Sequence, residues 1–236
     1  MKAIILAGGL GTRISEETDT KPKPMVLLDD KPIIWHLMNS FAVQGVTEFV
    51  LATGYLGHVM HEWVDKLNSP WKVDALDTGV STMTGGRIRQ CLEYIGPQRV
   101  YATYGDGLGN IDLSRLLTFH SHQGRLATVT AVRPPARFGV LESSNGLVTH
   151  FGEKRQADSG WINGGYFVLE PGIVDYIEDD GEPFETGALP RLVATEELSA
   201  FEHNGFWQPM DTLRERNELA ILAKGSNPPW ILNSPV

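Results

Sequence analysis

Glycines and cations are concentrated near the amino terminus, in the stretch ILAGGLGTRISEETDTKPKPM at residues 5–25. Gly8, Gly9 and Gly11 follow an apolar segment, so the backbone N–H groups there can close around phosphate oxygens. Arg13 can bind two such oxygens at once, because its guanidinium presents a planar fork of donors. The stretch predicts a site for a phosphorylated ligand. The alternative is a tight turn that carries a solvated arginine.

Lys23 lies between two prolines in the same stretch. Proline fixes its own φ and opposes helix formation, so we expect Lys23 on a stiff, extended segment. A side chain held in this way loses less entropy when it binds a phosphate. The dinucleotide fingerprint G-x-G-x-x-G is broken because Ile14 stands at its third glycine, and no G-K-[ST] follows. The pattern therefore disfavours a nicotinamide dehydrogenase.

Two aspartates far apart in the sequence are candidate metal ligands. Asp106, in YGDG, follows a predicted strand, and the carboxyl ends of strands are where ligands bind in open α/β sheets. Asp211 stands in QPMDT, much later in the chain. Two such carboxylates can jointly hold Mg²⁺, a hard cation that prefers oxygen ligands. The alternatives are a turn aspartate at Asp106 and a helix N-cap at Asp211.

Composition excludes several classes of function. The formal charge of −9 argues against nonspecific binding of nucleic acid, whose phosphates such a surface repels. No apolar run approaches the length of a membrane helix, and the opening MKAIILAGG is too short for a signal peptide. The single cysteine, Cys91, cannot form an internal disulfide and is interpreted as a packing residue. We expect a cytoplasmic protein with no membrane partner.

Strands and helices alternate through the first half of the chain, which predicts a parallel sheet with helices on both faces. The predicted strands are 2–7, 48–53, 72–76, 99–103 and 127–132, and the predicted helices are 32–44, 57–66, 86–94 and 113–123. From about residue 138, short strands (FGVLES, LVTHFGE, GGYFVLE) predict an antiparallel excursion onto the same sheet. A last helix is expected at 212–223. The predicted fold is α/β: one Rossmann-like domain over 1–236, with a mixed, mainly parallel sheet and a small antiparallel lobe.

Several motifs in a fixed order resemble those of the sugar-1-phosphate nucleotidylyltransferases. They are LAGGLGTR with KPKPM, GY at 54–55, DTGVSTMTGGR at 77–87, TYGDG at 103–107, FGVL at 138–141, INGGYFVL at 162–169 and GFWQPMDTLR at 205–214. More narrowly, the sequence is similar to the glucose-1-phosphate cytidylyltransferase group. The resemblance implies a GT-A-like fold and a homo-oligomer. It also implies Mg²⁺-assisted in-line attack of a sugar 1-phosphate, glucose 1-phosphate, on a nucleoside triphosphate, CTP, which gives CDP-sugar and pyrophosphate.

The resemblance also assigns roles to residues and regions. It implies a nucleotide-binding part at about 1–135, a sugar-binding part at about 136–211, and a C-terminal helix and tail at about 212–236. The catalytic residues would be Arg13, Lys23 and Asp106, and the metal ligands Asp106 and Asp211. The nucleotide would be bound by Leu6, Ala7, Gly8, Gly9, Gly11, Thr12, Arg13, Lys23, Thr84, Gly85, Gly86 and Asp106, and the sugar 1-phosphate by Gly139, Glu153, Lys154, Asn163 and Gly164.

Two departures from the family pattern bear on specificity. Arg155 replaces the usual proline after Glu153-Lys154, and the segment between Tyr55 and Asp77 is shorter than in the cytidylyltransferase group. Alternatives therefore stay open: the same chemistry with dTTP, UTP or GTP, or with another phosphorylated acceptor. A different class is a catalytically silent subunit that binds nucleotide sugars, which the joint presence of Arg13, Lys23, Asp106 and Asp211 disfavours.

Overall fold

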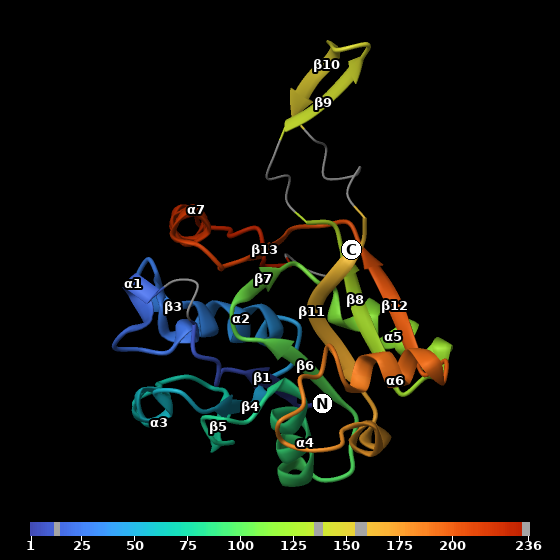
Figure 1. The fold of residues 1–236 in the computed structure, drawn as a ribbon. Helices are drawn as coiled ribbons and strands as arrows, with labels where there is room; N and C mark the ends of the chain where they lie inside the picture. The colour runs from blue at the N-terminus through green and yellow to red at the C-terminus, as the bar shows by residue number, and fades with distance from the viewer. Residues whose placement is uncertain (12–14, 135–138, 154–159, 233–236) are drawn as a thin grey trace.

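The computed structural model describes residues 1–11, 15–134, 139–153 and 160–232, and a seven-stranded sheet forms its core (Figure 1). The strand order is β12-β8-β11-β6-β1-β4-β5. The strands are β1 (Ala3–Leu6), β4 (Glu48–Thr53), β5 (Lys72–Asp77), β6 (Val100–Tyr104), β8 (Ala127–Val132), β11 (Ile162–Leu169) and β12 (Leu198–His203). All five strands expected in the first half of the chain are therefore confirmed, to within two residues at each end.

Most neighbouring strands of this sheet run parallel. β1 is parallel to both of its neighbours, β4 and β6, while β5 is parallel to β4 and β12 to β8. β11 runs antiparallel to β6 on one side and to β8 on the other. The predicted fold class, a mixed and mainly parallel α/β sheet, is confirmed, and one of the three predicted antiparallel segments joins that sheet.

The other two antiparallel segments do not join the main sheet. β9 (Gly139–Ser144) and β10 (Leu147–Glu153) pair with each other as a separate two-stranded sheet. Asn145 and Gly146 connect them, and both have positive φ, 52° and 81°. Two consecutive residues of this kind make the turn whose twist suits a tight hairpin, which explains why the strands pair locally. The expectation that these two strands extend the main sheet was wrong.

Helices cover both faces of the main sheet because successive side chains of each buried strand point to opposite sides. On one face, α2 (Ile33–Ala42), α3 (Gly57–Asp65) and α5 (Leu113–Gln123) pack on a core that contains Ile5. On the other, α4 (Thr84–Ile95), the 3-10 helix η4 (Pro171–Tyr176) and α6 (Ala188–Ala194) pack on a core that contains Ile4. Cys91 belongs to the second core, where burial raises the pKa of its thiol to about 12, so its role in packing is confirmed.

Short elements lie along the edge that carries the candidate site. They are α1 (Ser15–Thr18), the 3-10 helix η2 (Lys23–Met25), the pair β2 (Leu27–Leu28) and β3 (Lys31–Pro32), the pair β7 (Gly107–Gly109) and β13 (Trp207–Pro209), and α7 (Leu213–Ala223). In Figure 1, α7 and β13 lie near β7 although they come from the end of the chain. Within the described ranges, every helix is too short or too polar to span a membrane.

Candidate active site

Lys23 joins two carboxylates that are far apart in the sequence. Its Nζ lies 2.7 Å from Oδ2 of Asp106 and 2.7 Å from Oδ1 of Asp211, and it donates a hydrogen bond to each. The Lys23 side chain is 9% exposed, against 31% for Asp106 and 20% for Asp211. The ammonium is thus enclosed, while both carboxylates retain access to solvent or to a ligand.

The pairing of β7 with β13 brings the two aspartates together. Gly107 lies opposite Pro209 and Gly109 lies opposite Trp207. The pairing extends beyond the strands, because the Met210 N–H donates to the Asp106 carbonyl at 2.8 Å. Asp106 and Asp211 therefore flank the same end of a short antiparallel ladder, and this register places both carboxylates beside Lys23.

The N-cap of α7 is Thr212 rather than Asp211, the alternative that the sequence left open. The Thr212 hydroxyl accepts a hydrogen bond from the Glu215 N–H at 3.2 Å, and the Glu215 carboxylate accepts from the N–H groups of Thr212 and Asp211. This reciprocal capping box satisfies the start of the helix without the Asp211 side chain. The carboxylate of Asp211 is consequently available to bind Lys23.

The backbone around Lys23 differs from the expected extended segment. Pro22 is extended, with ψ of 151°, but Lys23 to Met25 form one turn of 3-10 helix with a proline in its first turn. Proline is tolerated there because the first N–H groups of a helix have no partner within the helix. The prolines still fix the backbone on both sides of Lys23, and that part of the prediction is kept.

The carboxylates keep Lys23 charged. Burial lowers the pKa of its ammonium, but Asp106 and Asp211 outweigh burial and raise that pKa above the ordinary value of 10.5. A raised pKa in the folded state means that the charged lysine stabilises the fold at every pH below 10.5. The contribution is lost only as the pH rises through the higher, folded value. Lys23 is therefore a permanent cation at neutral pH.

The same two carboxylates fit a divalent cation that also takes ligands from a substrate. Their nearer oxygens both contact one ammonium at 2.7 Å, so they are separated by no more than twice that distance. Across the described ranges, no group of three or more His, Cys, Asp or Glu side chains could hold a metal. Mg²⁺ is commonly held by one or two carboxylates together with substrate phosphates, and the pair meets that pattern.

The predicted phosphate loop begins where β1 ends. Leu6 is the last residue of β1, the Ala7 N–H donates to the Ala52 carbonyl, and Gly9 is exposed with open space where a side chain would stand. Gly11 has φ of +65°, and a Cβ there would lie 3.3 Å from the Cβ of Lys23. The loop and the lysine are therefore adjacent. Thr12 and Arg13 lie outside the described residues.

Arg87 is a residue of this site that the sequence analysis quoted in TGGR but gave no role. It is 4% exposed, and its guanidinium donates to the Thr53 carbonyl at 2.7 Å, to the Thr78 hydroxyl at 2.5 Å and to the Gly8 carbonyl at 3.0 Å. Gly8 follows β1, Thr53 ends β4 and Thr78 follows β5. A Cβ on Gly8 would lie 2.1 Å from a guanidinium nitrogen, so glycine is required there. Arg87 ties three loops together beneath the phosphate loop.

Arg87→Lys is expected to lower the free energy of unfolding by roughly 3 kcal/mol and to raise KM for the nucleotide. The lysine keeps the charge but cannot reach three acceptors at once, so the Gly8 loop loses its support. Urea unfolding and initial rates measure the two effects. Arg89→Lys is the control, because Arg89 pairs with Asp180 at the surface of the same helix. A variant with the stability and KM of the parent protein contradicts this role for Arg87.

The residues expected to contact the base have partners within the protein. The Thr84 hydroxyl donates to Glu185 at 2.7 Å and accepts from the Phe184 N–H at 2.8 Å. Gly85 and Gly86 are buried in the first turn of α4. A Cβ on Gly85 would lie 2.7 Å from the Glu182 carbonyl oxygen, and a Cβ on Gly86 would lie 2.5 Å from Asp180 Cα. Packing accounts for both glycines, so contact of this turn with a base stays a prediction.

The residues expected to bind the sugar come from two places. Gly139 and Glu153 lie directly opposite each other in the β9–β10 pair, while Lys154 lies outside the described residues. On β11, Asn163 is exposed, and its side-chain oxygen accepts from the Gly165 N–H at 2.8 Å. The Gly164 carbonyl accepts from Trp207 Nε1 at 2.8 Å. Trp207 therefore links β11 to β13, the strand that precedes Asp211.

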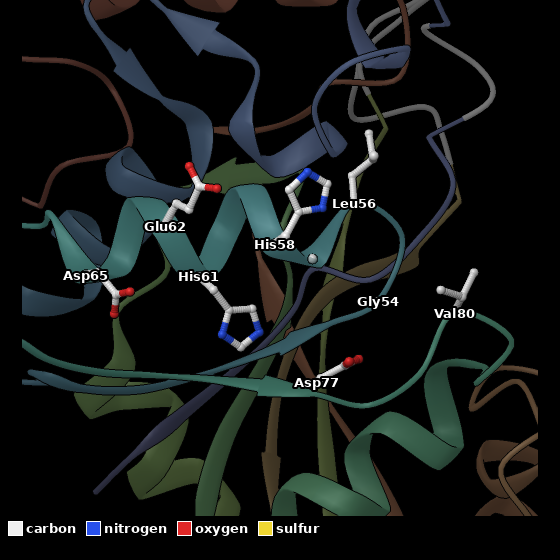
Figure 2. Close-up of a pocket in the computed structure, with 9 residues that line it drawn as sticks. Gly54, Leu56, His58, His61, Glu62, Asp65, Asp77 and Val80 are labelled. Atoms are coloured by element: carbon white, nitrogen blue, oxygen red, sulfur yellow. The ribbon is translucent and has the colours of Figure 1, made fainter.

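A cavity of about 560 Å³ lies between α3 and the ends of β4 and β5 and is shown in Figure 2. It is lined by Gly54, Leu56, Gly57, His58, His61, Glu62, Asp65, Asp77 and Val80. None of Lys23, Asp106 and Asp211 takes part in it. Three carboxylates on its wall repel a triphosphate, so its chemistry differs from that of the Lys23 cluster. Gly54 on the cavity wall lies against Arg87, because a Cβ there would lie 2.6 Å from a guanidinium nitrogen.

Comparison with known proteins supports the family resemblance that the sequence motifs indicated. The family model described as nucleotidyl transferase matches residues 2–213. A glucose-1-phosphate cytidylyltransferase of Salmonella typhi is 44% identical and covers 98% of both chains. A probable glucose-1-phosphate cytidylyltransferase of Bacillus subtilis is 42% identical and covers 93% of this chain and 94% of its own. The crystal structure of HddC from Yersinia pseudotuberculosis has a TM-score of 0.74 at 25% identity, over 94% of this chain and 99% of that one.

These matches confirm the predicted resemblance to sugar-1-phosphate nucleotidylyltransferases. The alignment with the Salmonella typhi protein spans 253 positions, more than the 236 residues of this chain, so that relative carries segments that this chain lacks. The matched region includes the phosphate loop, Lys23 and both aspartates. The chain belongs to the nucleotidyl transferase family.

Proposed function

We propose that this protein couples CTP to glucose 1-phosphate, giving CDP-glucose and pyrophosphate. The observation that carries the proposal is the contact of Lys23 with both Asp106 and Asp211, next to the phosphate loop. The choice of CTP and glucose 1-phosphate rests on the names of the relatives from Salmonella typhi and Bacillus subtilis. The site favours transfer of a nucleotidyl group between phosphates when a divalent cation is bound, because such a cation would offset the two carboxylates and leave Lys23 free to contact phosphate oxygens.

The proposed reaction needs no covalent intermediate on the protein. A phosphate oxygen of the sugar 1-phosphate forms a bond to the α-phosphorus of CTP, and the bond from that phosphorus to the oxygen of the leaving pyrophosphate breaks. Lys23 offsets charge at the α-phosphate, and the loop of Gly8 to Gly11, with Arg13, holds the leaving group. Positioning and charge neutralisation then supply most of the catalysis.

Nucleotidyl transferases of this family generally use a divalent metal, and we propose Mg²⁺. Asp106 and Asp211 would hold it, and when bound it would neutralise phosphate charge. We also propose that residues at about 1–135 bind the nucleotide, that those at about 136–211 bind the sugar, and that about 212–236 form the C-terminal helix and tail. A homo-oligomeric state and a cytoplasmic location stay predictions.

Pyrophosphate release tests the proposal across a matrix of CTP, dTTP, UTP and GTP against several sugar 1-phosphates, with and without Mg²⁺. We expect CTP with glucose 1-phosphate to give the highest kcat/KM, by at least about tenfold, and to depend on the metal. A faster pair would overturn the choice of substrates but keep the chemistry. Binding of nucleotide sugar without pyrophosphate release from any pair would support a catalytically silent subunit instead.

A further inference from the structure

Glu185 lies in an exposed position between η4 and α6, yet its carboxylate is held on two sides. One oxygen accepts a hydrogen bond from the Thr84 hydroxyl at 2.7 Å, and the other accepts from the Tyr104 hydroxyl. Thr84 begins α4 and Tyr104 ends β6, so the carboxylate is fixed between two separate elements. The two hydrogen bonds restrict the rotamers of Glu185, which costs side-chain entropy.

Tyr104 connects this carboxylate to the candidate active site. It stands two residues before Asp106, and its ring lies against Gly165, where a Cβ would be 2.4 Å from a ring carbon. Gly165 has φ of +77°, so glycine is required there for both conformation and space. Asn163 donates to the Tyr104 hydroxyl at 3.4 Å. The glutamate is therefore anchored on the side of Asp106 that carries the candidate sugar-binding residues.

The charge of Glu185 selects the kind of group that it can bind. Both of its donors are neutral hydroxyls, and in the described part of the chain no lysine or arginine forms an ion pair with it. An ionised carboxylate can accept about four hydrogen bonds, so acceptor capacity remains. A phosphate would be repelled, whereas a hydroxyl would donate to it in a charge-assisted hydrogen bond.

We propose that Glu185 is a specificity-determining residue that accepts a hydrogen bond from a ring hydroxyl of the acceptor sugar. The inference rests on the proposed function and adds a contact with the sugar outside the Glu153-Lys154 element. Thr84 and Tyr104 serve as positioning residues, because each holds one oxygen of the carboxylate. The acceptor is favoured over the nucleotide because Tyr104 contacts Asn163 and Gly165 of β11, the strand that carries two of the candidate sugar-binding residues.

The test compares the parent protein with Glu185→Gln. Glutamine keeps the size but loses the charge and one acceptor oxygen. We expect kcat/KM for glucose 1-phosphate to fall about 10- to 100-fold in Glu185→Gln relative to the parent protein. A set of deoxyglucose 1-phosphates, each lacking one ring hydroxyl, identifies the hydroxyl that is bound. For the sugar that lacks it, kcat/KM of the variant should stay within about twofold of that of the parent protein. KM for CTP should also stay within about twofold. Glu93→Gln, on the outer surface of α4, is the matched control.

Tyr104→Phe gives a second measure, because it keeps the charge of Glu185 but frees one oxygen. We expect a smaller loss of kcat/KM for glucose 1-phosphate than in Glu185→Gln, and no loss for the same deoxy sugar. Thermal unfolding shows that each variant is folded. Unchanged discrimination among sugars in Glu185→Gln would overturn the inference alone. If Glu185→Gln changed only the preference for CTP over dCTP or UTP, the inference would also be overturned, because the carboxylate would then contact the ribose or the base. A parent protein inactive with every sugar 1-phosphate would overturn the proposed function, and this inference with it.

Discussion

Lys23→Ala is expected to reduce pyrophosphate release by about 10²- to 10³-fold while the protein stays folded, the loss seen when one preorganised donor to a transition state is removed. The variant loses the cation that contacts both Asp106 and Asp211 at 2.7 Å. The two carboxylates then face each other without a partner of opposite charge. Because both are partly exposed, water can solvate them, so we expect the loss to be mainly catalytic.

Lys21→Ala is the matched control for this experiment. Lys21 belongs to the same KPKP segment, but its side chain is 30% exposed and lies 3.6 Å from Glu17. A partly exposed pair at this distance contributes little to stability, so both turnover and unfolding should be close to those of the parent protein. Far-UV circular dichroism and thermal unfolding establish the folded state. Equal rates for the parent protein and Lys23→Ala would remove Lys23 from the mechanism.

Asp106→Asn is expected to lower kcat/KM by a similar factor, about 10²- to 10³-fold, and to raise the Mg²⁺ concentration needed for half-maximal activity. Asparagine preserves the shape of the side chain but removes the charge that a metal would bind. It also removes one of the two carboxylates that raise the pKa of Lys23, so that pKa falls toward its ordinary value. Initial rates at increasing Mg²⁺ concentration measure both effects.

Asp112→Asn provides the comparison for Asp106→Asn. Asp112 is the N-cap of α5, where its carboxylate accepts from the Arg115 N–H at 2.9 Å. Asparagine caps helices as well as aspartate does, so this variant removes a negative charge from the segment that follows Asp106 without disturbing the fold. If both variants had the same metal requirement, general electrostatics and not metal binding at Asp106 would explain the effect.

The regular part of the fold was predictable because its residues obey clear periodicities. Short apolar runs that end at glycine predicted β1 and β4, and helical spacing of apolar residues predicted α2 and α3. The ladder of β7 and β13 was not predicted, since Gly107–Gly109 and Trp207–Pro209 have no alternating pattern and their pairing is a long-range contact. The edge strand β12 was not predicted either, because none of its side chains is fully buried and its apolar pattern is weak.

Only part of the candidate site was predicted, namely the residues that stand in recognisable motifs. Lys23, Asp106 and Asp211 carry charges in recognisable motifs, and their convergence in the structure agrees with the prediction. Arg87 and Glu185 were not assigned roles, because their significance comes from partners that the sequence does not identify. Arg87 binds mainly backbone carbonyls, and Glu185 binds two hydroxyls from other elements. Only the folded chain shows that a charge is buried or fixed.

The register of β7 with β13 limits how this part of the chain can evolve. Met210 is fully buried and Asp211 is partly exposed, so the two side chains occupy different environments on one short segment. Deleting a single residue from β13 would carry Asp211 into the buried position of Met210 and leave Thr212 beside Lys23. Exchange of a partly buried side chain such as Gln208 leaves the spacing intact. Natural variation in this segment should therefore consist of substitutions, with insertions and deletions confined to the loops outside it.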